Sequence, residues 1–163
     1  MARLSEVHRR YVRRETVVGV VINTLLSVAF ALAVSRGAPV ALATAAIDFG
    51  PQVFMVTFAT TLAITLIARK RLGAGAIPAL PREQGGPLRW APRNPLLRAV
   101  LFGALAAAVL APLSAGLLLA SGLDAVPATA FVLFKALYGA LLSFAVAPAI
   151  VRAALAGEVA ASH

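Results

Sequence analysis

The sequence predicts an all-α membrane protein with four transmembrane helices arranged as two hairpins. Three observations carry this prediction. The 163 residues are 61% hydrophobic and 13% charged, with a mean hydropathy of +0.90, whereas soluble domains average about half apolar and about a quarter charged residues. The apolar residues form four blocks long enough to cross a bilayer. Basic residues flank these blocks, as they do in membrane proteins.

Charged and Gly/Pro-rich segments divide the chain into five parts. We expect a basic amphipathic segment at 1–15, a first transmembrane hairpin at 16–68, a basic Gly/Pro-rich cytoplasmic linker at 69–95, a second hairpin at 96–155 and a C-terminal tail at 156–163. In the first part, Leu4, Val7 and Tyr11 share one helical face and arginines occupy the rest. This pattern predicts a separate interfacial helix on an anionic leaflet. Pro112 is expected to interrupt the third span.

The distribution of basic residues predicts the orientation. The N-terminal segment, the linker and the C-terminal end hold thirteen of the fifteen Lys and Arg residues, the other two being Arg36 and Lys135. Because loops rich in Lys and Arg stay in the cytoplasm, both termini are expected there. The same residues predict contact with anionic lipid headgroups rather than with nucleic acid, since no basic face interleaved with aromatic residues lies outside the spans.

Composition excludes several kinds of chemistry. The chain contains no cysteine, so disulfides, thiolate metal sites and thiol redox reactions are excluded. Its two histidines, His8 and His163, lie near the chain ends, and no residues have metal-ligand spacing. No phosphate-binding glycine loop is present either. We therefore expect no metal and no cofactor, and no enzymatic activity, since no acid and base residues converge.

Lys135 is the candidate functional residue, because an ionisable residue inside a span is costly to bury. Two acids, Asp48 and Asp124, belong to the same outer side and are its possible partners. One interpretation is a structural lysine that reaches outward and pairs with one of them. A second is a lysine that acts in coupling, gating or anion binding, and a third is contact with a partner protein.

Other intramembrane polar residues extend the candidate set. Asn23 is expected to form a hydrogen bond between helices. Thr57 and Thr61 either line a polar path or bond back to carbonyls of their own helix, and the second is the commoner behaviour. Tyr138 follows Lys135 by one helical turn and either donates a hydrogen bond nearby or packs as a core aromatic.

Small or polar residues recur at every fourth position in each span. Because close approach of small residues drives helix association in lipid, these stripes are expected to face the bundle interior. The stripes are Gly19, Asn23, Ser27 and Ala31; Thr57, Thr61 and Thr65; Ala99, Gly103, Ala107, Ala111 and Ala115; and Lys135, Gly139, Ser143 and Ala147.

The second hairpin contains the run Gly122-Leu123-Asp124, then a span, and then a closing run from Val146 to Arg152 of the type V-A-P-x-V-R. With these features it resembles a bacterial family of small two-helix inner-membrane proteins of unknown function. Ala153 stands where a second arginine is common in the family. The resemblance implies a hairpin fold and a location in the bacterial inner membrane, and it implies no activity. The first hairpin is then a candidate diverged copy.

These observations favour a non-catalytic structural or accessory membrane protein. We expect it to pack as a homo-oligomer or with a partner in a larger membrane complex, because small-residue stripes are abundant and polar groups are few. The alternative is an oligomeric transporter or channel for a small solute or ion, with Lys135 and Asn23 facing the pathway.

Overall fold

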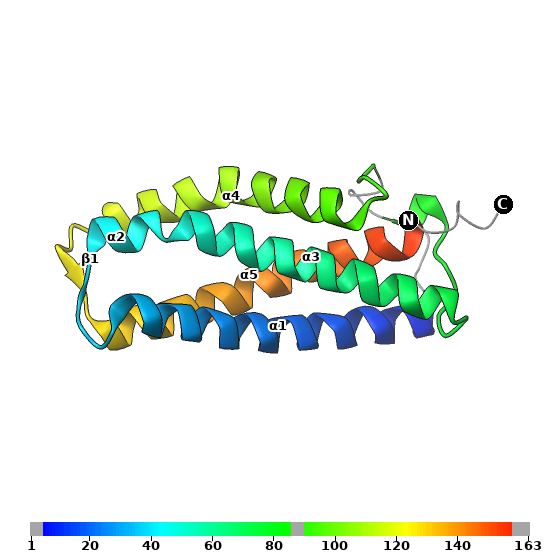
Figure 1. Cartoon of the computed structure of the whole chain (residues 1–163), viewed down its shortest axis with the longest axis horizontal. Helices are drawn as coiled ribbons and strands as arrows, with labels where there is room; N and C mark the ends of the chain where they lie inside the picture. Colours follow the sequence, from blue (N-terminus) through cyan, green and yellow to red (C-terminus); the bar gives the residue numbers. More distant parts are fainter. Residues whose placement is uncertain (1–4, 86–89, 158–163) are drawn as a thin grey trace.

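The computed structural model of the chain describes residues 5–85 and 90–157. Over these residues it has four helices that are long and apolar enough to cross a membrane: Glu6–Ser35, Leu42–Gly73, Pro95–Leu119 and Ala128–Ala156. They run side by side as an elongated bundle (Figure 1). The first begins and the last ends at the same end of the bundle, which we call the inner end (Figure 1).

Helix α1 (Glu6–Ser35) is continuous. Ser5 caps it by accepting a hydrogen bond from the backbone N–H of His8, and Arg36 ends it in the left-handed region at a φ of 47°. The expected separate interfacial helix is thus not a separate element here. No glycine or proline lies between positions 6 and 18, so nothing in the sequence breaks the helix before the span. Residues 1–4 of the expected segment lie outside the described residues.

The two outer loops pair with each other. Strand β1 (Val40–Ala41) lies antiparallel to β2 (Ala125–Val126). Next to this short ladder, the backbone N–H of Leu42 donates to the carbonyl of Asp124 over 3.0 Å. This pairing ties the two hairpin connections together at the outer end, opposite the chain ends (Figure 1).

The second span consists of α2 (Leu42–Ile47) and α3 (Phe49–Gly73), which meet at Asp48. Pro51 has no N–H to donate to the Ile47 carbonyl four residues earlier, so one bond of the helical ladder is lost here, while the N–H of Gln52 still donates to the carbonyl of Asp48 over 3.2 Å. Proline is well tolerated in the first turn of a helix, and α3 therefore starts directly after the junction. Asp48 itself keeps helical dihedral angles, with φ −65° and ψ −12°, so the break between α2 and α3 is local.

In the described part of the linker between α3 and α4, residues 74–85 and 90–94, the backbone is mostly irregular, as its prolines and glycines predict, and it includes a short 3₁₀ helix, η1 (Arg82–Gln84). It nevertheless packs against the inner end. Ile77 and Leu80 are buried in a cluster with Tyr11 and Leu155, and the N–H of Leu80 donates to the Leu155 carbonyl over 3.2 Å. One ring nitrogen of His8 lies 2.8 Å from the carbonyl oxygen of Pro78.

Helices α4 (Pro95–Leu119) and α5 (Ala128–Gly157) each contain a proline, Pro112 and Pro148 respectively. Both helices continue through these prolines. The expectation that Pro112 interrupts the third span is therefore wrong. Membrane helices tolerate such prolines because neighbouring groups compensate for the lost hydrogen bond. Asn94 caps α4 by accepting hydrogen bonds from the N–H groups of Leu96 and Leu97.

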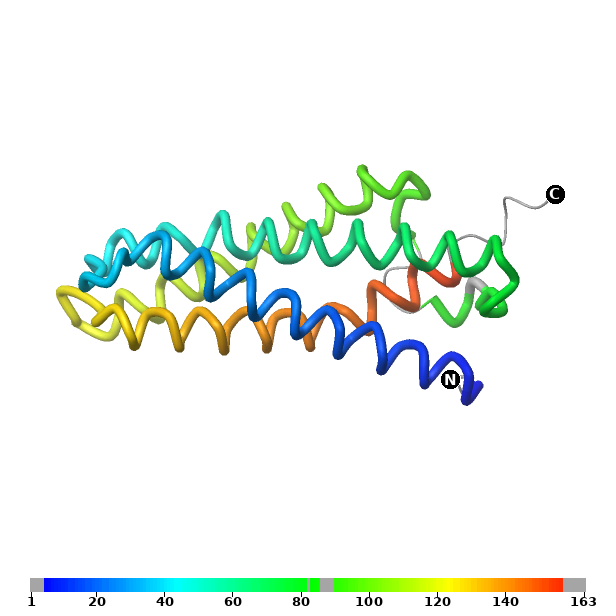
Figure 2. The backbone as a smooth tube through the Cα atoms, turned by 60° about the horizontal axis from the view of Figure 1, so that its bottom comes forward, coloured from blue at the N-terminus to red at the C-terminus, as the bar shows by residue number. Residues whose placement is uncertain are grey.

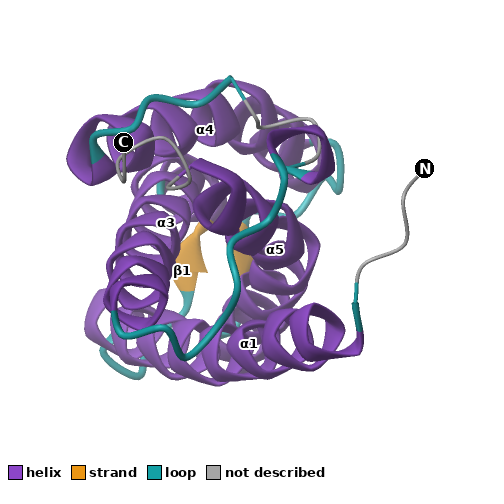
Figure 3. Ribbon diagram, turned by 90° about the vertical axis from the view of Figure 1, so that its right-hand side faces the viewer, coloured by secondary structure: helices purple, strands orange, loops and turns teal. Residues whose placement is uncertain are grey.

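The helices pack in an order that differs from their order in the chain. Helix α1 packs along α5, while α3 packs along both α4 and α5, and α1 and α3 meet at few points. Viewed from the inner end, α5 and α3 lie between α4 on one side and α1 on the other (Figure 3). Figure 2 shows α1 inclined across the bundle, so that its path differs from that of α3. The two expected hairpins therefore do not form two separately packed pairs.

The small-residue stripes face the interior, as predicted. The stripes of α1 and α5 meet each other: a Cβ on Gly19 would lie 3.3 Å from Ser143 Oγ, and a Cβ on Gly139 would collide with Ser27. The α4 stripe faces α3, since a Cβ on Gly103 would lie 3.0 Å from the Phe54 ring. Close backbone approach at small residues thus sets which helices pair.

Candidate functional site

Lys135 is buried in the outer half of the bundle and forms an ion pair. Its side chain belongs to α5 and is 1% exposed, and its ammonium Nζ lies 2.7 Å from Oδ2 of Asp48. Long helical side chains lean toward the N-terminus of their helix, which for α5 is the outer end, and this direction brings Nζ to the α2–α3 junction. The predicted pairing of Lys135 with one of two acids is therefore seen with Asp48. Asp124 is exposed in the outer loop and contributes its backbone carbonyl to Leu42.

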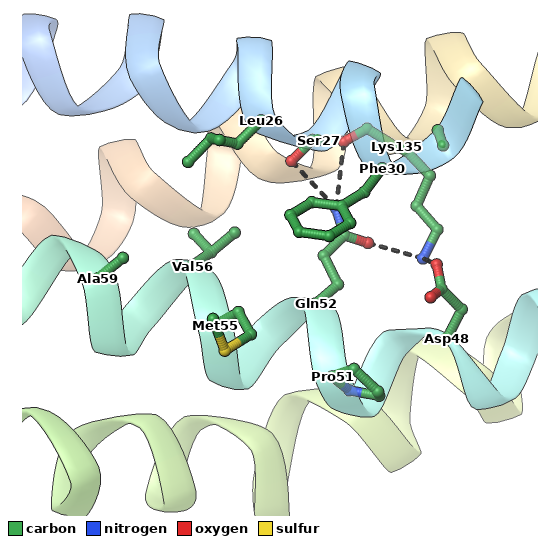
Figure 4. A pocket seen from close by; sticks show the side chains of 11 residues that line it. Leu26, Ser27, Phe30, Asp48, Pro51, Gln52, Met55, Val56, Ala59 and Lys135 are labelled. Atoms are coloured by element: carbon green, nitrogen blue, oxygen red, sulfur yellow. Dashed lines mark hydrogen bonds and ion pairs between the residues drawn. The ribbon is translucent and has the colours of Figure 1, made fainter. Parts of the chain in front are cut away.

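Gln52 completes the surroundings of the ion pair (Figure 4). The Lys135 ammonium donates to Gln52 Oε1 over 2.7 Å. The Gln52 amide nitrogen donates in turn to Ser27 Oγ at 3.2 Å and to the Lys135 carbonyl at 3.5 Å. One network therefore joins α1, α3 and α5. In it, the neutral amide of Gln52 links the buried ammonium of Lys135 to the hydroxyl of Ser27 on α1.

Two aromatic rings enclose the ammonium. Nζ lies 4.4 Å from the ring centroid of Phe49 and 5.4 Å from that of Phe131. Both rings are almost fully buried. Cation–π attraction within about 6 Å favours the charged lysine, and more strongly away from water. The ammonium thus has a carboxylate, an amide oxygen and two ring faces as neighbours.

A second polar cluster lies deeper in the bundle, around Asn23. Its amide nitrogen donates to Thr60 Oγ1 at 2.6 Å and to Ser143 Oγ at 2.9 Å. Asn23 is 2% exposed. The expected hydrogen bond between helices is therefore present, and it joins α1 to both α3 and α5.

The remaining predicted residues have separate environments. Thr61 donates to the carbonyl of Thr57 at 2.7 Å, which is the predicted bond within its own helix. The hydroxyl of Thr57 is buried and has no hydrogen-bond partner among the described residues. Tyr138 shares a hydrogen bond with Ser114 of α4 at 2.8 Å and packs its ring edge against Phe49. It does not bond to Lys135.

An ion pair at the inner end was not foreseen from the sequence. Arg71 Nη1 lies 3.2 Å from Oε1 of Glu15, whose side chain is 6% exposed, and the guanidinium lies 5.1 Å from the Tyr11 ring centroid. This pair connects the end of α3 with α1.

Ser27 and Gln52 are the site residues that sequence reasoning missed. A usable signal existed, because Asp48 and Gln52 are four residues apart and so lie on one face of a helix, as do Asn23 and Ser27. Within residues 5–85 and 90–157, no group of three or more His, Cys, Asp or Glu side chains could hold a metal ion.

Two cavities lie between α1 and α3. The outer one has a volume of about 250 Å³ and includes Lys135, Asp48 and Gln52 in its lining, together with apolar residues of both helices. The deeper one, of about 140 Å³, includes Asn23 and Thr60. Both are lined by Leu26 and Ala59, so they adjoin each other along the bundle.

Comparisons with protein-family models, with curated proteins and with solved structures gave no match. Function is therefore inferred from the residues and geometry described above.

Proposed function

We propose that this chain is a non-catalytic protein of a bacterial inner membrane that assembles with itself or with a larger membrane complex. Both chain ends lie on the cytoplasmic side in this proposal. Thirteen of the fifteen Lys and Arg residues belong to the segments at the inner end, which supports that orientation. The exposed arginines in the first turns of α1 then contact anionic headgroups at that surface.

One surface feature carries the assembly proposal. Besides the stripe that packs on α3, α4 has a second row of small residues at four-residue spacing on its exposed side: Ala104, Ala108 and Gly116, with Pro112 in the row. Small residues at such spacing let a second helix approach closely in lipid. The internal polar residues support the same proposal, because Lys135, Asn23 and Tyr138 bond to other residues of this chain.

The test is the oligomeric state in lipid nanodiscs or in mild detergent, measured by multi-angle light scattering and by crosslinking in native membranes. We expect a dimer or larger assembly, or a stoichiometric partner that co-purifies. Ala108→Leu adds bulk to the exposed row and is expected to weaken the assembly. Ala33→Leu, on the exposed side of α1, is the matched control. A wild-type chain that stays monomeric and alone in both settings overturns the proposal.

A second candidate function is an oligomeric pathway for a small solute or ion, and the two cavities favour it. They place Lys135 and Asn23 in the lining of adjoining spaces between the same two helices. Flux across proteoliposomes that is lost in Lys135→Ala, and kept in Asp124→Asn, would favour this function. Absence of flux for every ion tested, with an intact assembly, would favour the first.

A further inference from the structure

Helices α1 and α3 are connected by polar contacts at three levels. From the inner to the outer end these are Glu15 with Arg71 at 3.2 Å, Asn23 with Thr60 at 2.6 Å, and Ser27 with Gln52 at 3.2 Å. The two cavities lie between the same helices. We call this region, from Glu15 to Ala31 on α1 and from Asp48 to Arg71 on α3, the α1–α3 seam.

The outer cavity opens toward the lipid side of the seam. Leu26, Phe30 and Met55 line it and are 41%, 60% and 48% exposed, respectively. At its other side lie Ser27 and Lys135, which are almost fully buried. Figure 4 shows the aromatic and apolar side chains of α1 and α3 around this space, with the ion pair at one end. The cavity therefore combines an apolar entrance with a polar floor.

The polar floor of the outer cavity, formed by Ser27, Asp48, Gln52 and Lys135, offers a ligand a hydrogen-bond acceptor rather than a free cation. The Lys135 ammonium already donates to Asp48 and Gln52 and lies over two aromatic rings. The Asp48 side chain is still 26% exposed while its Oδ2 contacts Lys135. A ligand that donates a hydrogen bond can thus meet the carboxylate. An anionic ligand would have to replace Asp48 at Lys135, and any added net charge is costly in a poorly solvated place.

The polar floor lies toward the outer end of the seam. Ser27 lies eight residues before the end of α1 at Ser35, which corresponds to about 12 Å at 1.5 Å per residue. Asp48 lies six residues after the start of α2 at Leu42, which corresponds to about 9 Å. Because the arginines at the start of α1 belong at the inner interface, the floor lies within the outer half of a hydrocarbon core of about 30 Å. A hydrocarbon chain attached to a head at this level would extend along the seam toward Ala59 and the deeper cavity.

We propose that the α1–α3 seam binds one uncharged single-chain amphiphile from the bilayer. Its hydroxyl head donates a hydrogen bond to the Asp48 carboxylate, and its chain lies against Val56 and Ala59 and enters the deeper cavity. This inference goes beyond the proposed function, because binding requires neither assembly nor transport. It assigns the outer cavity a ligand class set by hydrogen-bond donation, absence of charge and a hydrocarbon chain.

The test uses the wild-type chain in lipid nanodiscs and a 1-dodecanol analogue with a diazirine near the chain end. After irradiation, peptide mapping is expected to place the label on α1 and α3 next to the deeper cavity, between residues 18 and 26 or 59 and 67. Excess 1-dodecanol should remove the label, while equal concentrations of dodecane or dodecanoate should leave most of it. Equal competition by dodecane, stronger competition by dodecanoate, or labelling spread over all four helices overturns the proposal.

A variant pair tests the location independently. Ala59 lines both cavities, so Ala59→Leu fills their junction and should reduce specific labelling by about tenfold. Ala145→Leu on the exposed side of α5 should leave labelling unchanged. Thermal unfolding of both variants checks that they fold, and light scattering of the same samples reports assembly separately. Undiminished labelling of a folded Ala59→Leu variant overturns the proposal. In case this variant does not fold, the competition experiment on the wild-type chain tests the proposal by itself.

Discussion

The ammonium of Lys135 lies 2.7 Å from Oδ2 of Asp48, which ties α5 to the junction between α2 and α3. The lysine is almost fully buried, and the acid is about three-quarters buried. Removing one member of such a pair leaves the other charge without its counter-charge in a poorly solvated place, which costs more than removing both charges. The pair is therefore expected to stabilise the outer half of the bundle only while both members are present.

Lys135→Met is expected to lower the free energy of unfolding by about 3 kcal/mol, because Asp48 is left unpaired. The double variant Lys135→Met with Asp48→Asn should recover part of this loss, since it no longer contains the isolated carboxylate. Equilibrium unfolding in detergent micelles measures both values. A double variant as unstable as the sum of the two single variants would show that the residues act independently.

Asp124→Asn is the matched control for the acid partner. Asp124 is exposed and offers its backbone carbonyl, which the substitution keeps. Its effect on the free energy of unfolding should stay within about 0.5 kcal/mol. If Asp124→Asn proves as costly as Asp48→Asn, the pairing of Lys135 in the membrane differs from the one described.

Asn23→Ala is expected to lower the free energy of unfolding by about 1 kcal/mol, because it removes hydrogen bonds to both Thr60 and Ser143. Thr60→Val should show a coupling to it in a double-mutant cycle. Thr24→Ala is the control, since the Thr24 hydroxyl bonds to the Val20 carbonyl of its own helix. A Thr24→Ala effect equal to that of Asn23→Ala would argue against a bond between helices as the source of stability.

The span positions and their interior faces were predictable, since both depend on local pattern. Gly19, Asn23 and Ser27 recur at four-residue spacing in α1, as do Gly139 and Ser143 in α5, and they do lie between packed helices. Which stripe packs on which was not predictable. In lipid, hydrophobicity does not select helix pairs, so pairing depends on how the surfaces of small and large side chains fit. The partner of α1 is consequently α5, the helix most distant from it in the chain.

Of the candidate site, only its central residue, Lys135, could be predicted from the sequence. Lys135 stands out because it is a charge within an apolar block, but the sequence left Asp48 and Asp124 as equal partners. The choice depends on how the outer loops are arranged by the pairing of β1 with β2, and strands of two residues have no strong local signal. Glu15 and Arg71 escaped notice for a related reason: each lies near the end of its own span, where a charge normally faces headgroups.

Gly139→Ala is expected to destabilise the chain by about 1–3 kcal/mol, the usual cost of overpacking. A Cβ at this position would collide with the Ser27 side chain and come within 3.3 Å of the Asn23 carbonyl oxygen, forcing α1 and α5 apart. Gly50→Ala is the matched control, because Gly50 is also helical and a Cβ there meets nothing within 4 Å. Thermal unfolding in the same detergent compares them. A Gly139→Ala variant as stable as Gly50→Ala would contradict the close approach of α1 and α5.

The proposed orientation can be tested with single cysteines, because the natural chain contains none. Ser121→Cys lies exposed in the outer loop before β2, and Ala74→Cys lies exposed directly after α3 at the inner end. A membrane-impermeant maleimide added to spheroplasts should label Ser121→Cys at once. It should label Ala74→Cys only after the membrane is permeabilised, since the basic segments keep the inner end in the cytoplasm. The reverse labelling pattern would place both chain ends outside, and it would require that the positive charges of this chain do not set its topology.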